Sequence, residues 1–152
     1  QEIIDHLHEV SDNLEAQCLF LTIGRISLTD PAAAVRGYWE RAGVRFEGLR
    51  LIDGSGLARA NMIRPLDLAR VNLAARRGPH GGQYVQSLNP SLGGNVRAKL
   101  GGMSGVKTDT GFLTLENGRI YTFALMANGV GTGFDFWRLR DELLTAVRHA
   151  AE

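Results

Sequence analysis

The sequence is short of several features that would assign a protein to a particular class. Its single cysteine excludes an internal disulfide, and no apolar run approaches the roughly 18 residues of a membrane-spanning helix. The net charge is +1 and the Arg76-Arg77 pair is too short for a basic patch, so nothing favours a nucleic-acid partner. The four histidines are not grouped with carboxylate or thiol side chains, so we predict no metal site and no cofactor.

Lysine is scarce as well, and its scarcity draws attention to two positions. Of 17 basic residues only Lys99 and Lys107 are lysines. A compact ammonium is not interchangeable with a guanidinium in a reaction site, which makes Lys99 a candidate functional residue. Leucines surround Cys18 on a predicted helix, so we expect it to be a small buried hydrophobic residue. We expect His6 and His8 to face solvent.

What is present is the composition of an ordinary folded chain. With 152 residues, 44% of them hydrophobic and 22% charged, the chain can bury a sizeable core. We therefore interpret residues 1–152 as one domain or as part of one. Many of the 19 glycines lie between Gly78 and Gly133, where we expect tight turns and close approaches of the backbone.

Capping residues and apolar residues at helical spacing predict helices in the first half of the chain. These helices cover 2–10, about 14–24, 31–42 and 65–77. Asp30-Pro31 is a cap followed by a first-turn proline, whereas Gly24, Gly43 and Gly78 are the expected ends. We expect no regular structure at 79–95.

The last third of the chain predicts a small sheet and one helix. Strands are expected at 96–100, 111–115 and 119–128, and Asn117-Gly118 is a strong hairpin signal between the last two. An apolar stripe that begins at Phe136 predicts a final helix. The predicted fold class is α/β (α+β), with helices first, then a three-stranded antiparallel meander, then a C-terminal covering helix.

Three polar clusters remain once the predicted core is set aside. Taken singly, Ser11-Asp12-Asn13 is a helix cap and residues 53–61 are a glycine-rich turn. Lys99 alone is typical of a strand edge protected against aggregation. In this order, however, a Ser-Asp-Asn at a helix start and a Lys-x-Gly on a strand are the second and third motifs of serine penicillin-binding enzymes.

The middle cluster narrows this similarity to one family. Asp-Gly-Ser-Gly-Leu-x-Arg-x-Asn at 53–61 resembles the D-alanyl-D-alanine carboxypeptidase/endopeptidase family, the low-molecular-mass class C penicillin-binding proteins. The stretch 11–20 and the pattern Lys-x-Gly-x-x-x-Gly-Val at 99–106 resemble the same family. The resemblance covers nearly the whole chain and corresponds to the C-terminal half of a family member. It implies the C-terminal part of the β-lactamase/penicillin-binding transpeptidase-like fold.

The resemblance also implies catalytic roles. Ser11 would relay a proton toward the leaving amine, and Asn13 would hydrogen-bond the substrate backbone and orient the lysine of a Ser-x-x-Lys motif. Lys99 would supply positive potential for the relay and for the substrate carboxylate. The backbone N–H of Gly102 would form half of an oxyanion hole, where one donor is worth about 10²–10³ in rate.

Substrate contacts are implied for Arg59, Leu100, Gly101, Met103 and Ser104. Arg59 could grip a carboxylate with paired N–H donors. The implied ligands are peptidoglycan stem peptides ending in D-Ala-D-Ala and β-lactam antibiotics, and the implied location is the periplasm or cell envelope.

The chain departs from the family pattern in two places. No Ser-x-x-Lys motif precedes Ser11, and Ser104-Gly-Val-Lys107, which matches the letters, follows a strand in a glycine-rich turn. A nucleophilic serine and its lysine need one face of a helix, so we expect residues 1–152 alone to be inactive. In addition, Leu100 stands where the family has threonine. The lost hydrogen bond to a charged group would cost about 1.5–3 kcal/mol of binding.

Two alternatives stay open at this point. Leu100 favours a non-catalytic penicillin-binding-like pseudoenzyme that binds cell-wall peptide or a partner protein. A separate structural expectation is that the meander leaves a sheet edge or face uncovered. The N-terminal half of the fold, or a second copy of the chain, would then cover it.

Overall fold

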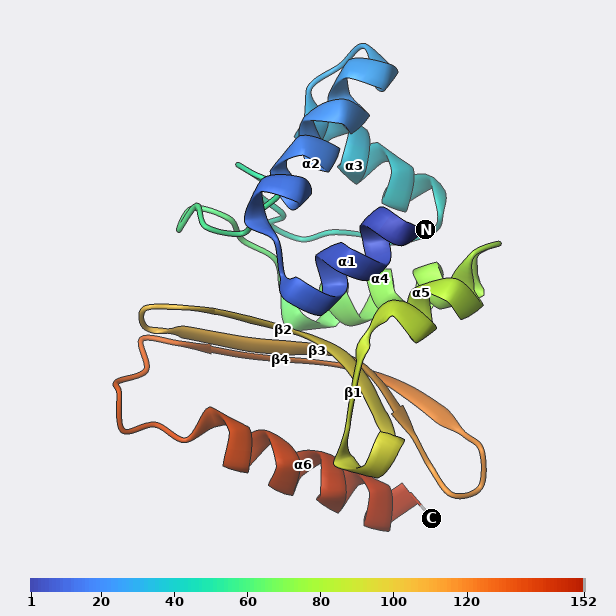
Figure 1. The fold of residues 1–152 in the computed structure, drawn as a ribbon, viewed down its shortest axis with the longest axis vertical. Coiled ribbons are helices and arrows are strands. Elements are labelled where there is room, and N and C mark those ends of the chain that lie inside the picture. Colours follow the sequence, from blue (N-terminus) through green and yellow to red (C-terminus); the bar gives the residue numbers. More distant parts are fainter. Residues whose placement is uncertain (152) are drawn as a thin grey trace.

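The computed structural model describes residues 1–151, which form a sheet between two unequal helical layers. Figure 1 shows the helices that precede the sheet in the sequence on one side of it and the long C-terminal helix on the other. The elements are α1 (Glu2–Val10), α2 (Asn13–Ser27), α3 (Pro31–Arg41), α4 (Pro65–Arg77), α5 (Gly81–Ser87), β1 (Asn89–Ser91), a 3-10 turn (Leu92–Gly94), β2 (Val96–Met103), β3 (Val106–Thr114), β4 (Ile120–Asn128) and α6 (Phe136–Ala151). The predicted mixture of helices, antiparallel meander and covering helix is therefore confirmed.

The sheet is four-stranded and antiparallel, in the order β1-β2-β3-β4. Ser104 and Gly105 turn β2 into β3, because Met103 pairs with Val106. Asn117 and Gly118 lie in the turn between β3 and β4, as predicted, and Gly118 takes a φ of 79° that favours glycine. The same register sets Lys99 directly opposite Thr110.

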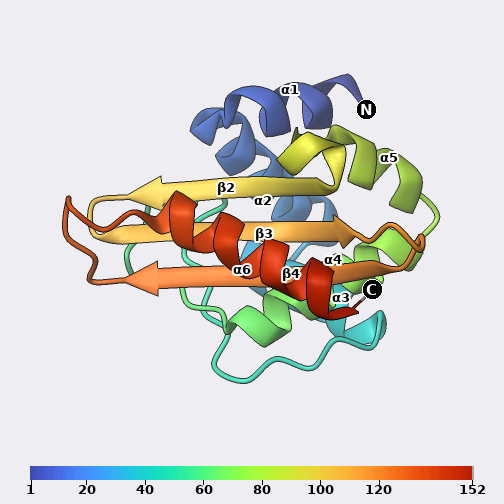
Figure 2. The same ribbon diagram turned by 90° about the horizontal axis from the view of Figure 1, so that it is seen from below.

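Alternation along the strands divides the sheet into two faces. On one face Val96, Ala98 and Leu113 form a core with Leu144 of α6. Figure 2 shows α6 crossing the strands diagonally over this face. The opposite face carries Phe112, whose ring meets Tyr84 of α5 edge to face at 6.0 Å. Helices α4 and α5 therefore cover the face on which Lys99 lies.

Two predictions of local structure were wrong. Helix α2 continues past Gly24 to Ser27. Gly24 is a point of close packing instead of a helix end, since a Cβ there would lie 2.5 Å from Cγ of Pro31. Residues 79–95 are not irregular, since they contain α5 and β1. Strand β1 depends on pairing with β2, a partner that local sequence does not show.

Cys18 is exposed on α2, which contradicts the expectation that it is buried. Within residues 1–151, no single helix is long and apolar enough to cross a membrane; α2 and α3 reach that length and composition only as a pair bent by 79°.

The described part of the chain leaves one long sheet edge open. β4 is the last strand of the sheet and pairs only with β3. Helix α6 also exposes four large apolar side chains, Trp137, Leu139, Leu143 and Val147. The expected uncovered edge is thus present.

Candidate active site

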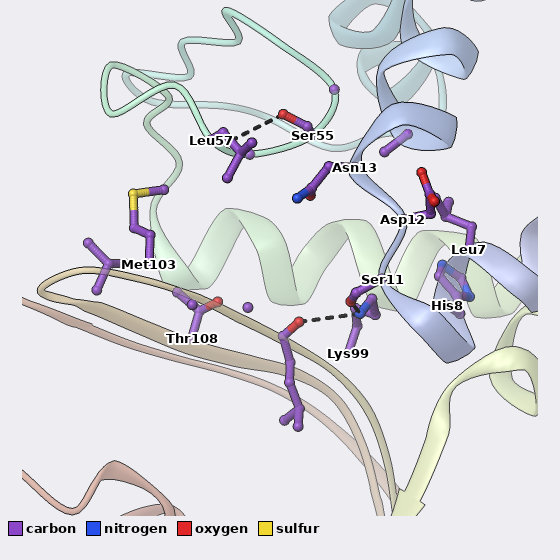
Figure 3. Close-up of a pocket in the computed structure, with 17 residues that line it drawn as sticks. Leu7, His8, Ser11, Asp12, Asn13, Ser55, Leu57, Lys99, Met103 and Thr108 are labelled. Atoms are coloured by element: carbon purple, nitrogen blue, oxygen red, sulfur yellow. Dashed lines mark hydrogen bonds between the residues drawn. The ribbon is translucent and has the colours of Figure 1, made fainter.

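A cleft of about 570 Å³ lies between the helical layer and strand β2. It is lined by Ser11-Asp12-Asn13 at the junction of α1 and α2, by 54–57 of the glycine-rich loop, and by 99–103 of β2. Figure 3 shows labelled side chains from all three segments around this hollow. The fold thus brings together the polar clusters that the sequence singled out, including Ser11, Asn13 and Lys99.

Ser11 and Lys99 are in direct contact. Ser11 ends α1 in a left-handed conformation (φ 58°), with its N–H bonded to the carbonyl of Leu7. Lys99 Nζ donates a hydrogen bond to Ser11 Oγ, across 88 residues of sequence. Partial burial lowers the pKa of Lys99, which makes its ammonium easier to deprotonate than a solvated lysine.

The residues after Ser11 start the next helix. The Asp12 carboxylate accepts a hydrogen bond from the Glu15 N–H at 2.8 Å and so caps α2. This cap fixes the chain direction between α1 and α2. As a result, Asn13 stands in the first turn of α2, at the wall of the cleft opposite β2.

The glycine-rich loop is held by one carboxylate. Asp53 accepts hydrogen bonds from Asn61 Nδ2 (2.7 Å), Ser55 Oγ (2.9 Å) and the backbone N–H groups of Gly56 and Ala58. Although desolvation alone would raise it, these bonds hold the pKa of Asp53 below its usual value. The loop is therefore a rigid anionic turn, and its Gly54 rests against α2, where a Cβ would lie 2.4 Å from Cβ of Phe20.

Arg59 and Ser104 meet beside the cleft rather than inside it. Both terminal nitrogens of Arg59 lie 3.3 Å from the Ser104 carbonyl oxygen, to which they donate. Arg59 also lines a second hollow of about 600 Å³, together with Met62, Met103 and Met126. Met103 borders both hollows, which are therefore adjacent.

Strand alternation separates Leu100 from Lys99. Leu100 pairs with Asp109, which is bonded to Arg140 of α6, so its side chain shares the α6 face of the sheet. Its carbonyl oxygen accepts a hydrogen bond from Lys99 Nζ at 3.4 Å. At Lys99, Leu100 thus contributes a backbone hydrogen-bond acceptor to the cleft. The loss of a substrate contact through this leucine stays a prediction.

The backbone of β2 beyond Lys99 borders the cleft as well. Gly101 faces Thr108 so closely that a Cβ would lie 2.5 Å from Thr108 Oγ1. Gly102 is exposed and pairs with Lys107 of β3. Gly101 therefore keeps the Lys99 face of this stretch free of a side chain, whereas a Cβ at Gly102 would meet Lys107 on the other face of the sheet.

Two polar cleft residues, His8 and Thr108, were not among the site residues that the sequence indicated. His8 is half-buried and lines the cleft, which corrects the expectation that it faces solvent; His6 is exposed as expected. Thr108 lines both hollows. Neither stood out in the sequence, because only the strand register and the approach of α5 to α1 bring them to the cleft. Among residues 1–151, no three His, Cys, Asp or Glu side chains are grouped so as to hold a metal ion.

Known proteins share this fold. Penicillin binding protein 4 from Haemophilus influenzae superposes with a TM-score of 0.77 and 24% identity, over 99% of this chain and 38% of that one. The same protein complexed with a novel β-lactam gives a TM-score of 0.78. The TLA-1 extended-spectrum β-lactamase gives 0.69 at 16% identity, over 97% of this chain and 62% of that one. The β-lactamase-like fold is therefore shown.

Sequence comparison is more specific. The D-alanyl-D-alanine carboxypeptidase DacB of Haemophilus influenzae is 28% identical over 87% of this chain and 32% of its own length. The carboxypeptidase DacB of Mycolicibacterium smegmatis is 27% identical over 85% of this chain and 34% of its own length. The chain thus spans about a third of the length of these relatives. Residues 1–143 match the D-Ala-D-Ala carboxypeptidase 3 (S13) family, and the chain therefore belongs to that family.

Proposed function

We propose that this polypeptide forms two walls of the active-site cleft of a serine-type D-alanyl-D-alanine carboxypeptidase that acts on peptidoglycan stem peptides. One wall is Ser11-Asp12-Asn13 and the other is β2 with Lys99. The observation that carries the proposal is the contact between Lys99 Nζ and Ser11 Oγ. It joins two motifs that are far apart in the sequence, at the edge of an open cleft that can admit an extended peptide. Substrates of this kind place the reaction in the periplasm or cell envelope.

In the proposed reaction a serine hydroxyl attacks the carbonyl carbon of the D-Ala-D-Ala bond. A C–O bond forms, the C–N bond breaks, and the serine proton passes through Ser11 Oγ to the amine of the departing D-alanine. The Gly102 N–H donates to the oxygen that becomes negative. Water then hydrolyses the acyl-enzyme. Lys99 holds positive charge beside Ser11 throughout.

We further propose that the nucleophilic serine lies outside residues 1–152, so that this polypeptide alone is inactive. The Ser-x-x-Lys pattern occurs once in the sequence, at Ser104 and Lys107. Ser104 lies in the β2–β3 turn and accepts the Arg59 hydrogen bonds through its carbonyl. Lys107 lies in β3, on the sheet face opposite to Lys99. This pair does not share the face of a helix, as an activated serine and lysine must.

Two experiments test the function. A peptide ending in D-Ala-D-Ala should bind the 152-residue chain without covalent change, as measured by shifts of backbone amide resonances. Lys99→Met should weaken that binding by about 10- to 100-fold, because a hydrogen bond to a charged group is lost. Lys107→Met is the matched control, because this lysine lies on the other face of the sheet, and it should bind like the wild type.

Fluorescent penicillin should label no residue of the same chain. Labelling at Ser104 would contradict the proposed place of the nucleophile. Equal binding by the Lys99→Met and Lys107→Met variants would contradict the proposed function itself.

A non-catalytic peptide-binding protein is the second candidate, and Leu100 at the position of the family's threonine favours it. The two candidates differ in turnover. We expect D-alanine release from a stem peptide when a polypeptide with the Ser-x-x-Lys helix completes the fold. Binding without release in that complete protein would favour the pseudoenzyme.

A further inference from the structure

His8 occupies a position in the cleft that no family motif explains. It lies in the last turn of α1, one turn before Ser11, and lines the same hollow as Ser11 and Lys99. Figure 3 shows the His8 ring beside these residues, at the junction of α1 with β2. His8 is therefore a second side chain, besides Lys99, that can carry positive charge in this part of the cleft.

The hydrogen bonds of His8 define which ring nitrogen is free. Ser87 Oγ donates its proton to the Tyr84 carbonyl at 2.8 Å. The same oxygen lies 2.8 Å from His8 Nδ1, and since its proton is already used, it accepts from Nδ1–H. The neutral ring thus keeps its proton on Nδ1. Among the bonds of the described residues, Nε2 takes part in none, which leaves it for a ligand.

We propose that His8 is a specificity residue of this site, which binds the free carboxylate of the substrate together with Lys99 by donating from Nε2. The inference rests on the proposed function, because it assumes a peptide with a free C-terminus. A donor from α1 would add a hydrogen bond to the carboxylate at a site where the Leu100 side chain supplies none.

The charged and titratable groups around His8 determine its pKa and how that pKa responds to a bound carboxylate. Burial and, second, the Lys99 ammonium on β2 lower the pKa of His8, whereas Asp5 on its own helix acts in the opposite direction. From α5 it faces Tyr84, which is neutral because burial raises its pKa to about 12, and Ser87. Because its pKa lies below 6.5, His8 is mostly neutral at pH 7 before a ligand binds. A carboxylate between His8 and Lys99 offsets the repulsion, so the ring takes up a proton when the ligand binds.

Nuclear magnetic resonance of the four histidine rings in the 152-residue chain tests this prediction directly. Saturating D-alanyl-D-alanine should raise the titration midpoint of His8 by about one to three pH units, the effect of an opposite charge in contact. D-Alanyl-D-alanine amide, which lacks the carboxylate, should leave the midpoint unchanged. Because the wild-type chain is used, no variant has to fold.

Two variants on the same helix sharpen the test. The affinity for D-alanyl-D-alanine should rise as the pH falls through the midpoint of His8, and His8→Gln should abolish that dependence. His6→Gln is the matched control, since His6 is exposed and pairs with Glu15 instead; its affinity should keep the wild-type pH profile.

Each other outcome has a distinct meaning. If the dipeptide perturbs Lys99 and Ser11 but leaves the His8 midpoint in place, the His8 subsite is wrong and the proposed function stands. An equal shift with the amide, or an unchanged pH profile in His8→Gln, also overturns the subsite. If neither ligand perturbs any cleft resonance, both proposals fail.

Discussion

Asp109 of β3 and Arg140 of α6 form a buried ion pair, with Nε 2.7 Å from Oδ2, on the sheet face opposite to Lys99. The exposed fractions of the two side chains are 0% and 6%. Arg140 also donates to Ser91 Oγ of β1 and to Asp141 of α6 itself, so one guanidinium ties α6 to β1 and β3, the two strands that flank β2. Burial raises the pKa of Asp109, against the opposing effect of Arg140. The pair therefore depends on keeping both partners.

Replacing Arg140 by methionine should be strongly destabilising. Methionine fills similar space but leaves the Asp109 carboxylate buried without a counter-charge, for which we expect a loss of about 3–5 kcal/mol of unfolding free energy. Urea denaturation followed by circular dichroism measures the change. The control is Arg138→Gln, which removes an exposed pair with Glu142 on the same helix. A loss in Arg140→Met no larger than in this control would show that the buried pair does not stabilise the sheet.

A second buried network supports the Lys99 side of the sheet. Asn72 of α4 is 1% exposed; it accepts from Tyr84 OH at 2.7 Å and donates to Thr110 Oγ1 at 2.7 Å. Thr110 lies directly opposite Lys99. Asn72→Ala leaves the buried Tyr84 hydroxyl without its partner and should cost about 1–3 kcal/mol of unfolding free energy.

Tyr84→Phe gives the comparison for this network. It removes the hydroxyl that Asn72→Ala leaves without a partner. The double variant should therefore lose less unfolding free energy than the two single variants added together. Thermal or urea unfolding of the four proteins completes the cycle. Strict additivity would mean that the hydrogen bond between Asn72 and Tyr84 contributes no coupling.

Gly111 allows β2 and β3 to approach closely beneath the cleft. A Cβ at this position would lie 2.1 Å from the Arg97 carbonyl oxygen and 2.6 Å from Cα of Ala98, both backbone atoms of β2. Gly111→Ala should therefore displace β2, and with it Lys99, and cost about 1–3 kcal/mol of unfolding free energy. Unfolding measurements and weaker binding of the D-Ala-D-Ala peptide would report the displacement.

Gly82 in α5 is the matched glycine, because no heavy atom lies within 4 Å of a Cβ built there. Gly82→Ala should be neutral or stabilising by up to about 1 kcal/mol, since alanine is the better helix former. If the two alanine variants were equally stable, the close approach at Gly111 would not constrain the sheet.

The sequence predicted what depends on neighbours along the chain and missed what depends on contacts between distant segments. Asp12 and Asp30 cap helices as expected, because capping involves residues within one turn. Strand β1 was missed because it exists only through pairing with β2, and Gly24 was mistaken for a helix end because its partner, Pro31, lies beyond the helix. The exposure of Cys18 likewise depends on which face of α2 its neighbours cover.

The candidate site divides in the same way. Ser11, Asn13, Lys99 and the 53–61 loop could be selected because their motifs are contiguous and their order in the chain resembles a known family. Nothing local distinguishes His8 from His6, two residues away on one helix. Tertiary packing separates their environments, because it brings Ser87 of α5 and Lys99 of β2 to His8 and Glu15 of α2 to His6.

That difference predicts that the pKa values of the two histidines shift in opposite directions in the ligand-free chain. The hydrogen bond and charge of Glu15 raise the pKa of His6 above the ordinary 6.5, whereas burial and the Lys99 charge lower the pKa of His8 below it. Ring resonances recorded between about pH 5 and pH 8 should show His8 titrating at the lower pH. Coincident midpoints would remove the distinction between the two environments.

The two shifts also affect stability with opposite signs. The unfolded chain binds a proton at His8 more readily than the folded one, so this residue lowers stability as the pH falls below 6.5 toward its folded pKa. The His6–Glu15 pair acts in the other direction: its contribution is complete below 6.5 and is lost as the pH rises through the raised pKa. Urea midpoints measured across this pH range should therefore fall less steeply below pH 6.5 in His8→Gln than in the wild type. In His6→Gln they should fall less steeply above pH 6.5. Because both histidines lie on α1, the helix that Ser11 caps, these midpoints report how much the contacts of α1 contribute to the stability of the chain at each pH.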